Sequence, residues 1–253
     1  MVGVYLSGTG NTKHCIEKLT GLLDSAAKTV PLESKNVVEE IEKNSEIILG
    51  YPTQFSNSPY MVRDFINRNK LLWNGKKVLC VATMGAFSGD GAGCTARLLK
   101  KYGATILGGL HIKMPDSVCD NKLLKKTLEQ NRQLVIEADK KIEQAAEQIK
   151  GGKYPRDGIT FISHIAGLFG QRLWFYGKTT GYSDKLKIAQ NCVGCGLCAK
   201  LCPMENISIQ DGKAVSGNRC TMCYRCISHC TQKAITLVGD KVTEQCRFER
   251  YSS

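Results

Sequence analysis

Short apolar segments alternate with longer segments of mixed polarity along the first 150 residues. The apolar segments predict β-strands near 2–6, 27–32, 45–50, 77–83 and 104–112. Between and after them, apolar residues recur at helical spacing and predict helices near 12–24, 59–70, 92–102 and 120–150. The last helix carries one apolar stripe: Leu124, Leu128, Val135, Ala138, Ile142, Ala145 and Ile149. Such alternation indicates an α/β fold with a parallel sheet and helices on both faces.

The pattern changes after residue 186, where cysteines dominate. Eight of them form two runs of C-x-x-C-x-x-C-x-x-x-C, namely Cys192, Cys195, Cys198 and Cys202, then Cys220, Cys223, Cys226 and Cys230. Each cysteine of the first run has a counterpart 28 residues later, so the region is an internal duplication. A strand-like segment follows each run, at 207–209 with an Asp211-Gly212 turn and at 234–238 with Gly239-Asp240. We therefore expect each half to contain a ligand loop, a short helix and a hairpin.

The doubled spacing is typical of bacterial two-cluster ferredoxins, in which the fourth cysteine of each run binds the other cluster. The predicted ligands of cluster I are Cys192, Cys195, Cys198 and Cys230, and those of cluster II are Cys220, Cys223, Cys226 and Cys202. Zinc sites favour paired C-x-x-C motifs with longer spacers, and disulfides need an oxidising compartment. The third, equally spaced cysteine and the repeat argue against both. We expect two 4Fe-4S clusters, which carry electrons one at a time.

A loop rich in glycine and hydroxyl groups follows the first strand. It reads Ser7-Gly8-Thr9-Gly10-Asn11-Thr12 and leads into the first helix. Backbone N–H groups, hydroxyls and the positive end of a helix dipole together favour an anion there. The loop matches neither the P-loop nor the G-x-G-x-x-G pattern, so a single phosphate monoester is the better fit.

Two later loops follow the third and fourth strands. Within 51–59 the candidate cofactor-binding residues are Pro52, Thr53, Gln54 and Phe55, and within 83–91 they are Thr83, Met84, Gly85, Ala86, Phe87 and Gly89. The phosphate loop and the order of elements resemble those of flavodoxins, and the whole chain resembles a flavodoxin–ferredoxin fusion family. The resemblance implies a sheet of order 2-1-3-4-5, with FMN at the carboxyl ends of its strands. It also implies that Phe55 or Tyr51, together with Phe87, contacts the flavin ring.

We expect four segments along the chain. They are a flavodoxin-like FMN-binding domain at 1–150, an apolar and aromatic linker at 151–186, a ferredoxin domain with two 4Fe-4S clusters at 187–246, and a tail at 247–253. The linker is too apolar for a free tether. It is a poor transmembrane span, because His164, Gln171 and Arg172 interrupt it. It could dock the two domains, form a wall beside the flavin, or offer a surface to a partner or a membrane.

The formal net charge is +12, and the clusters and an FMN phosphate would lower it. The remaining basic charge favours an acidic, low-potential redox partner through electrostatic steering, or an anionic small-molecule acceptor. A nucleic-acid partner is disfavoured, because no basic stripe is interleaved with aromatic residues. The cysteine content indicates a reducing, cytoplasmic location. Because oxygen damages exposed clusters, we expect an anaerobic host. We expect no signal peptide, because a predicted strand follows Met1 directly. Beyond the motif, Cys80 is predicted to lie in the core, and Cys94 at a helix N-terminus is a candidate reactive thiol.

A flavin carries one or two electrons, whereas each cluster carries one. We therefore expect an iron–sulfur flavoprotein that moves electrons between two clusters and FMN. One alternative is an FMN-dependent reductase of a quinone, enone or nitro compound, fed by its own clusters, and another is a redox sensor. The sequence singles out no catalytic acid or base. Three polar residues lie near the predicted flavin ring only by their position in the two loops: Ser56, Asn57 and Asp90.

Overall fold

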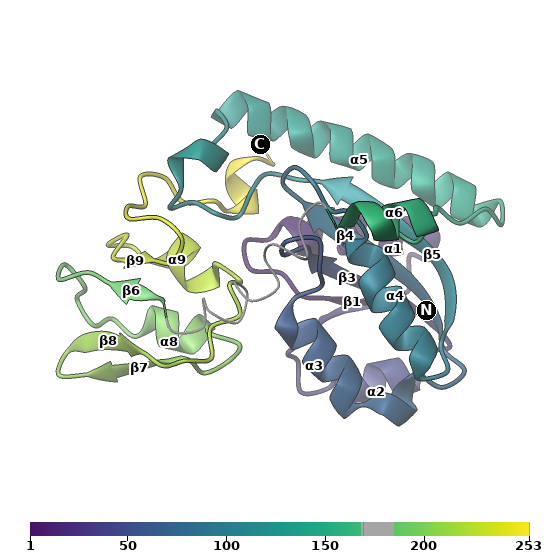
Figure 1. Ribbon diagram of the computed structural model, residues 1–253, viewed down its shortest axis with the longest axis horizontal. Helices are drawn as coiled ribbons and strands as arrows, with labels where there is room; N and C mark the ends of the chain where they lie inside the picture. Colours follow the sequence, from purple (N-terminus) through teal and green to yellow (C-terminus); the bar gives the residue numbers. More distant parts are fainter. Residues whose placement is uncertain (168, 170–184, 253) are drawn as a thin grey trace.

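The computed structural model describes residues 1–167, 169 and 185–252. Two parts of unequal size lie side by side (Figure 1). The larger part is built on a five-stranded sheet, and the smaller part carries the eight motif cysteines on short elements. The linker stretch 173–176 lies outside the described residues.

The larger part is a doubly wound parallel sheet. Its strands are β1 (Val2–Tyr5), β2 (Lys28–Pro31), β3 (Glu46–Pro52), β4 (Lys77–Met84) and β5 (Thr105–Lys113). They pair in parallel in the order β2-β1-β3-β4-β5. The predicted fold class and strand order are thereby confirmed.

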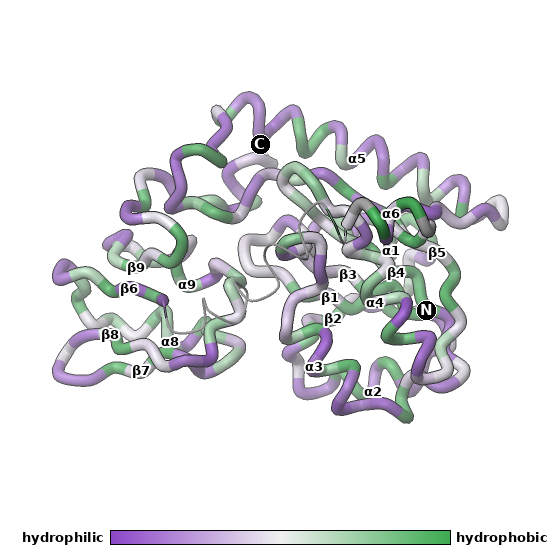
Figure 2. Tube along the Cα trace, in the orientation of Figure 1, coloured by the Kyte–Doolittle hydropathy of each residue, from purple (hydrophilic) through white to green (hydrophobic). Residues whose placement is uncertain are grey.

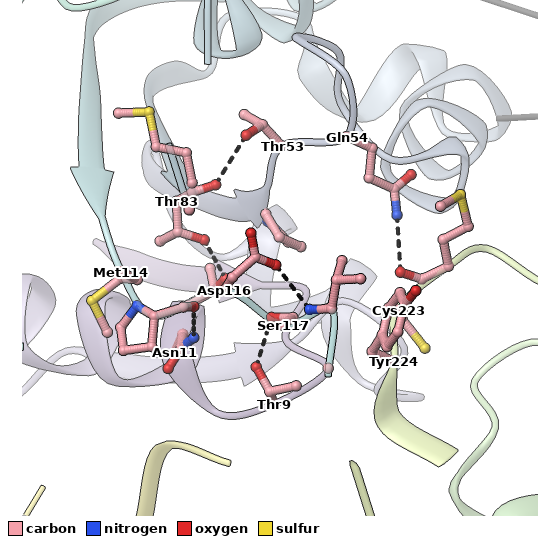
Figure 3. A pocket seen from close by; sticks show the side chains of 18 of the residues that line it. Thr9, Asn11, Thr53, Gln54, Thr83, Met114, Asp116, Ser117, Cys223 and Tyr224 are labelled. Atoms are coloured by element: carbon pink, nitrogen blue, oxygen red, sulfur yellow. Dashed lines mark hydrogen bonds between the residues drawn. The ribbon is translucent and has the colours of Figure 1, made fainter. Parts of the chain in front are cut away.

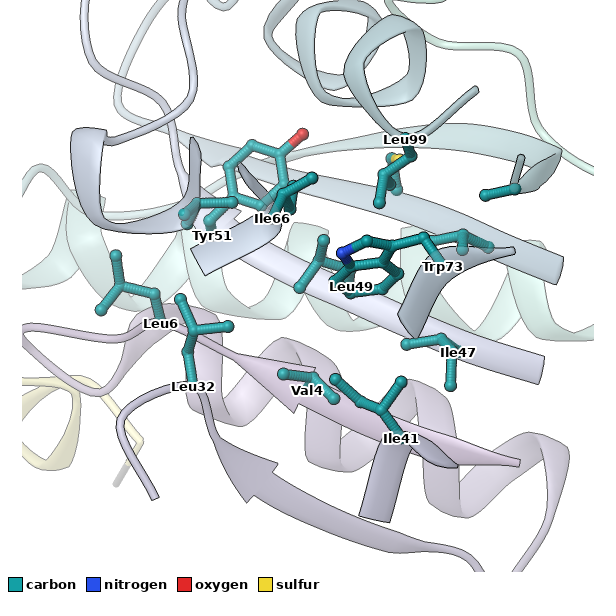
Figure 4. Close-up of a cluster of buried hydrophobic side chains, with 14 of the residues drawn as sticks. Val4, Leu6, Leu32, Ile41, Ile47, Leu49, Tyr51, Ile66, Trp73 and Leu99 are labelled. Atoms are coloured by element: carbon teal, nitrogen blue, oxygen red, sulfur yellow. The ribbon is translucent and has the colours of Figure 1, made fainter. Parts of the chain in front are cut away.

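Helices cover both faces of this sheet. On one face lie α1 (Asn11–Leu23) and α5 (Leu128–Lys150), and on the other lie α2 (Val37–Glu42), α3 (Tyr60–Arg68) and α4 (Gly91–Lys101). The second face buries the fully enclosed Trp73 against strand residues such as Ile47 and Leu49, with Ile41 and Leu99 close by (Figure 4). Two separate apolar layers therefore hold the sheet, as its apolar strands require.

Three details differ from the sequence prediction. Helix α2 and the short 3-10 helix Lys70–Trp73 were not predicted as separate elements. Helix α5 begins at Leu128 rather than near 120, because Thr127 caps it: its hydroxyl accepts from the Gln130 N–H at 3.2 Å, and the Gln130 side chain accepts from the Thr127 N–H at 2.9 Å. Leu124 and Leu128 are accordingly 40% exposed, while the rest of the stripe packs in the layer against the sheet. Along α5, hydrophobic and hydrophilic segments of the trace alternate (Figure 2).

The smaller part contains two separate antiparallel strand pairs. β7 (Ile207–Gln210) pairs with β8 (Lys213–Ser216), and β6 (Lys187–Ile188) pairs with β9 (Ile235–Thr236). The hairpin predicted at Asp211-Gly212 is present, and both turn residues have positive φ. The second predicted hairpin, at 234–240, is wrong, because its strand pairs with β6 from before the first cysteine run. Two short helices, α8 (Leu197–Leu201) and α9 (Arg225–His229), complete this part.

The duplication is visible in the backbone as well as in the sequence. Left-handed residues occur at Gly194, Gly196 and Glu205 in the first copy, and 28 residues later at Met222, Tyr224 and Lys233 in the second. Two glycines of the first copy are thus replaced by larger residues that keep the same backbone conformation. Side chains other than glycine are strained there.

The segments after α5 and at the C-terminus both return to the sheet. Residues 155–157 run beside β5, with backbone hydrogen bonds from Gly109 to Pro155 and from Asp157 to Gly109. Helix α6 (Phe161–Gly167) then packs on α4, and His164 contacts the buried Asp90 carboxylate at 2.9 Å. Residues 155–167 of the linker therefore pack on the α/β part, whereas Leu186 is buried in the smaller part.

The predicted tail also packs against the larger part of the molecule. Phe248 stacks on His14 of α1 with the ring centroids 4.2 Å apart, and its N–H donates to the Thr9 carbonyl at 2.8 Å. Tyr251 is buried in the layer between α1, α5 and the sheet. No helix in the part of the chain that is described is long and apolar enough to cross a membrane.

Candidate functional site

A cavity of about 270 Å³ lies at the carboxyl ends of the parallel strands, where doubly wound folds bind their ligands. All but two of the residues predicted to bind FMN line it. They are Ser7, Gly8, Thr9, Asn11, Thr12, Pro52, Thr53, Gln54, Phe55, Thr83, Met84, Gly85, Ala86 and Phe87. Three loops that are far apart in the sequence therefore meet at one site, and side chains from several of them are drawn in Figure 3.

Gly10 and Gly89 are the two predicted residues that do not line the cavity. Gly10 caps α1 with φ of 95°, and a Cβ there would meet Phe248 at 2.7 Å. Gly89 faces Gly167 of α6 and the side chain of Ser56. Tyr51, the alternative predicted ring contact, does not line the cavity either: it is fully buried, and its hydroxyl donates to the Gly91 carbonyl at 3.0 Å.

Hydrogen bonds hold the loops around the cavity in place. The Thr12 and Thr83 hydroxyls lie 2.8 Å apart and join the phosphate loop to the end of β4. The Thr9 hydroxyl lies 2.9 Å from that of Ser117, and the Asn11 amide donates to the Pro115 carbonyl at 2.7 Å. Such contacts leave the loop ordered before any ligand binds, which lowers the entropic cost of binding.

The segment after β5 completes the cavity, and the sequence prediction missed it. Met114, Pro115, Asp116, Ser117 and Val118 all line the space. Burial raises the pKa of the Asp116 carboxyl, although the Val118 N–H donates to it at 2.8 Å. The Asp116 carboxyl also lies against Gly85, where a Cβ would come within 2.4 Å of it. A glycine at 85 is therefore required for the carboxyl to approach this loop.

The small part of the molecule supplies the last wall. Met222, Cys223 and Tyr224 line the same cavity as the phosphate loop. A Cβ on Gly8 would lie only 1.7 Å from the Cys223 carbonyl oxygen, so the two backbones touch at this point. The Gln54 amide also donates to the Thr221 carbonyl at 2.7 Å. A predicted ligand of cluster II thus lies at the edge of the predicted FMN site.

The motif cysteines gather in the two crossed sets that the spacing predicted. Cys192, Cys195, Cys198 and Cys230 surround one cavity, and Cys202, Cys220, Cys223 and Cys226 surround another. Among the residues described, no three His, Cys, Asp or Glu side chains converge closely enough to hold a single metal ion. Thiols placed around a space fit a cube, because each thiolate then binds a different iron.

Backbone N–H groups point at the sulfurs with the period of the duplication. Asn206 donates to Cys202 and, 28 residues later, Ala234 donates to Cys230, both at 3.3 Å. Ala214 donates to Cys192 at 3.4 Å. Hydrogen bonds to sulfur stabilise thiolates and tune cluster potentials, so these residues also fit iron–sulfur ligation.

The buried carboxylate of Asp120 ties the smaller part to the loop after β5. It is 3% exposed, and one of its oxygens accepts from the N–H groups of Leu237, Val238 and Gly239 at 2.6, 3.0 and 3.1 Å. Its other oxygen accepts from the Tyr224 hydroxyl at 3.1 Å. Burial, reinforced by this carboxylate, raises the pKa of Tyr224, which therefore stays a donor. No sequence motif marks this contact between distant segments.

The other polar candidates from the flavin loops have different roles. Asp90 is fully buried and pairs with Arg97 at 2.6 Å and with His164. Neither Asp90 nor Ser56 nor Asn57 lines the cavity at the strand ends. Burial raises the pKa of Cys94 despite the nearby arginines, which opposes the predicted reactivity of this thiol. Cys80 lies in the core as predicted.

Comparison with known proteins agrees with this architecture. A family model described as a flavodoxin domain matches residues 3–134, which is more than half of the chain, and one described as a 4Fe-4S dicluster domain matches residues 185–231. The chain therefore belongs to the flavodoxin domain family and carries a C-terminal 4Fe-4S dicluster domain. It is an electron-transfer redox protein; the dicluster domain implies two clusters, and the redox domains imply electron-transfer partners.

Several solved flavodoxins are similar to the N-terminal part. Two-electron reduced Megasphaera elsdenii flavodoxin shares 24% identity, covers 58% of this chain and 99% of its own, and has a TM-score of 0.42. Oxidised flavodoxin 2 from Bacillus cereus shares 21% identity over 60% and 97% of the two chains, with a TM-score of 0.44. Fusobacterium nucleatum flavodoxin bound to flavin mononucleotide shares 21% over 60% and 98%, with a TM-score of 0.41. No curated protein sequence matches the chain.

Proposed function

We propose that this protein moves electrons between two 4Fe-4S clusters and FMN within one chain, and that it converts between one-electron and two-electron transfer. One observation carries the proposal. Cys223, a predicted cluster II ligand, lines both the cavity surrounded by the second cysteine set and the cavity formed by the flavin loops. FMN accepts one or two electrons and each cluster accepts one, so adjacency of the sites is what such a conversion requires.

The proposed order of the centres follows from exposure. Cys195 is exposed and its neighbour Val193 is 61% exposed, so the first cysteine set faces solvent. Cys223 and Cys226 lie inward, against the flavin loops and the core of the dicluster domain. A partner protein would exchange electrons at cluster I, and cluster II would relay them to or from FMN.

In this proposal, the chain's own residues bind and orient FMN. The hydroxyls of Ser7, Thr9 and Thr12 and the N-terminus of α1 hold its phosphate. Phe55 and Phe87, which line the cavity from separate loops, contact the ring and exclude water from its faces. The four segments at 1–150, 151–186, 187–246 and 247–253 are then the FMN domain, the connecting strap, the dicluster domain and a tail that closes on α1.

A first experiment is anaerobic purification with iron, sulfide, zinc and flavin quantified on one sample. We expect about eight iron, eight sulfide and one FMN per chain. Zinc without sulfide would remove the basis for electron transfer. Iron without flavin would indicate that residues 1–150 act as a docking domain without a cofactor and that the chain is a ferredoxin.

A second experiment tests the order of the centres. The protein is mixed with a reduced low-potential donor protein, and FMN reduction is followed by absorbance. Cys195→Ala removes a ligand of cluster I, and Cys220→Ala removes one of cluster II. We expect both to slow FMN reduction by the donor protein. Direct chemical reduction of FMN should be unchanged, and this control shows that the flavin site is intact. Unchanged donor rates in Cys220→Ala would refute the relay.

Asp116 favours a second function, reduction of a small organic substrate such as a quinone, enone or nitro compound. Its carboxyl lines the cavity beside Gly85, and burial raises its pKa, so it can hold a proton near a bound substrate. The discriminating measurement is turnover of these three substrate classes with and without Asp116→Asn. If Asp116→Asn loses turnover but retains FMN binding and electron transfer, the reductase function is supported. If the wild type turns over none of the three substrate classes, only the electron-carrier function remains.

A further inference from the structure

A second cavity, of about 320 Å³, opens between the two domains on the other side of Gln54. Gln54 lines both this cavity and the predicted FMN site. The flavodoxin side contributes Ser58 and Arg63, and the dicluster side contributes Arg219, Cys220 and Thr221. The cavity is therefore built from both domains and lies beside a predicted cluster II ligand.

Three residues that line this cavity carry buried polar atoms without partners. Ser58 is 2% exposed and Thr221 is 7% exposed, and neither side-chain hydroxyl has a hydrogen-bond partner. The Nε of Arg63 is also buried without a partner. Buried polar groups normally form hydrogen bonds within the protein, because a group that loses its hydrogen bonds to water and gains none in return is energetically unfavourable. Three such groups from two domains, on residues that line one cavity, favour a polar ligand there.

The charge around the cavity identifies the sign of that ligand. Arg63, Arg68 and Arg219 line it, and none of its lining residues is acidic. Arg68 is paired with Asp64 at 2.9 Å, and Arg219 donates to the Glu205 carbonyl. Within the residues that the structure describes, the Arg63 side chain forms neither a hydrogen bond nor an ion pair. A guanidinium without a counter-ion in a partly buried site attracts a carboxylate or a phosphate.

We propose that this interdomain cavity binds a small organic anion. Its carboxylate or phosphate lies against the Arg63 guanidinium and accepts from the Ser58 and Thr221 hydroxyls. Its apolar body lies against Tyr60 and Met204, which also line the space. The volume of about 320 Å³ is near the lower end of small-molecule sites.

Binding would also affect the redox chemistry, and this second step rests on the proposed assignment of Cys220 to cluster II. Reduction adds negative charge to the cluster. An anion beside Cys220 disfavours that charge, so binding should lower the reduction potential of this cluster. The ligand would thereby regulate transfer between cluster II and the flavin without entering the flavin site.

Calorimetry on the full-length, cluster-loaded protein tests the binding step. The probes are inorganic phosphate, malate and benzoate, each at constant ionic strength. We expect at least one to bind the wild type, and Arg63→Met and Thr221→Val each to weaken it, the first by tenfold or more. Lys100→Gln, which removes an exposed positive charge on α4, is the matched control and should change affinity less than twofold. Failure of all three probes to bind, or equal weakening in Arg63→Met and Lys100→Gln, would overturn the site.

Potentiometric titration tests the redox step separately. With the bound anion saturating, one cluster potential should fall in the wild type and stay unchanged in Arg63→Met. An unchanged wild-type potential, with calorimetric binding intact, would overturn the coupling. Because calorimetry requires no assumption about the clusters or FMN, failure of the anion site is distinguishable from failure of the proposed electron path.

Discussion

Asp120→Asn should loosen the contact between the two domains without changing the shape of the side chain. One Asp120 oxygen accepts three backbone hydrogen bonds from Leu237, Val238 and Gly239, and the other accepts the Tyr224 hydroxyl. An asparagine keeps the volume but loses the negative charge. Its amide group can replace only one of the two oxygens as an acceptor, so either the three N–H groups or the tyrosine must adapt.

The expected loss can be worked out from the hydrogen bonds. Bonds to a charged group contribute roughly 1.5–3 kcal/mol, and neutral ones roughly 0.5–1.5 kcal/mol. The difference is about 1 kcal/mol per bond, so the four bonds together lose about 2–4 kcal/mol. Local opening of the 237–239 segment should then become about 30- to 1000-fold more frequent, since each 1.4 kcal/mol is a factor of ten.

Native-state hydrogen exchange on the cluster-loaded protein measures this opening. The amides of residues 237–239 should exchange faster by that factor in Asp120→Asn. Asp211→Asn is the matched control, because Asp211 is exposed in the β7–β8 turn and asparagine tolerates its positive φ. Exchange at 237–239 within threefold of the wild type would refute the view that the Asp120 charge holds the domains together.

Three further perturbations test other contacts. Burial lowers the pKa of His111 to about 4, so below pH 6.5 the unfolded chain binds a proton that the folded chain does not. The free energy of unfolding should therefore fall by about 2 kcal/mol from pH 7 to pH 5 through this group, and His111→Gln should lack this loss. Urea titrations that give the wild type and His111→Gln the same dependence on pH would contradict this prediction. Gly8→Ala should weaken FMN binding tenfold or more in a fluorescence titration, because the added methyl group meets the Cys223 carbonyl. The control is Gly21→Ala, since Gly21 lies on α1 with no neighbouring atom where the methyl group would be. Equal FMN affinities of the two variants would exclude the close contact between Gly8 and Cys223. Phe248→Ala removes a half-buried ring that packs on the phosphate loop, so it should lower the free energy of unfolding by about 2 kcal/mol in urea and should weaken FMN binding. Unchanged FMN affinity would show that the tail does not contribute to the FMN site.

The sequence predicted those features that depend on local pattern. Strand and helix alternation gave the sheet, and the spacing of the cysteines gave two sets whose members meet around separate cavities. The start of α5 could also have been predicted from the sequence, because Thr127 and Gln130 form a recognisable capping box. The prediction placed the helix too early by following the apolar stripe through Leu124, which tertiary packing leaves exposed.

Features that depend on contacts between distant segments could not be predicted. Asp116 follows β5 without a motif, and it reaches the cavity only because β5 ends beside β4 in the sheet. The approach of Cys223 to Gly8 joins residues more than two hundred positions apart. The strand at 235–236 pairs with β6, which precedes the first cysteine run, instead of forming a local hairpin.

The two copies of the cluster motif differ in the residues that adopt left-handed conformations. Gly194 and Gly196 adopt left-handed conformations in the first copy, and Met222 and Tyr224 adopt the same conformations in the second. Each larger side chain costs roughly 1–2 kcal/mol there, a cost that glycine avoids. Met222 and Tyr224 nevertheless line the predicted flavin cavity, and Tyr224 also bonds to Asp120.

Two left-handed glycines of the first copy are thus replaced by larger, strained residues in the copy that packs on the flavodoxin domain. The first copy keeps glycines at these positions and an exposed Cys195, which suits the proposed exchange of electrons with a partner at cluster I. Replacing Tyr224 with glycine should therefore relieve backbone strain, yet it should open the cavity and release Asp120. We expect such a variant to keep both clusters in iron analysis but to slow FMN reduction by a donor protein. An unchanged rate would show that the asymmetry between the copies has no part in electron transfer.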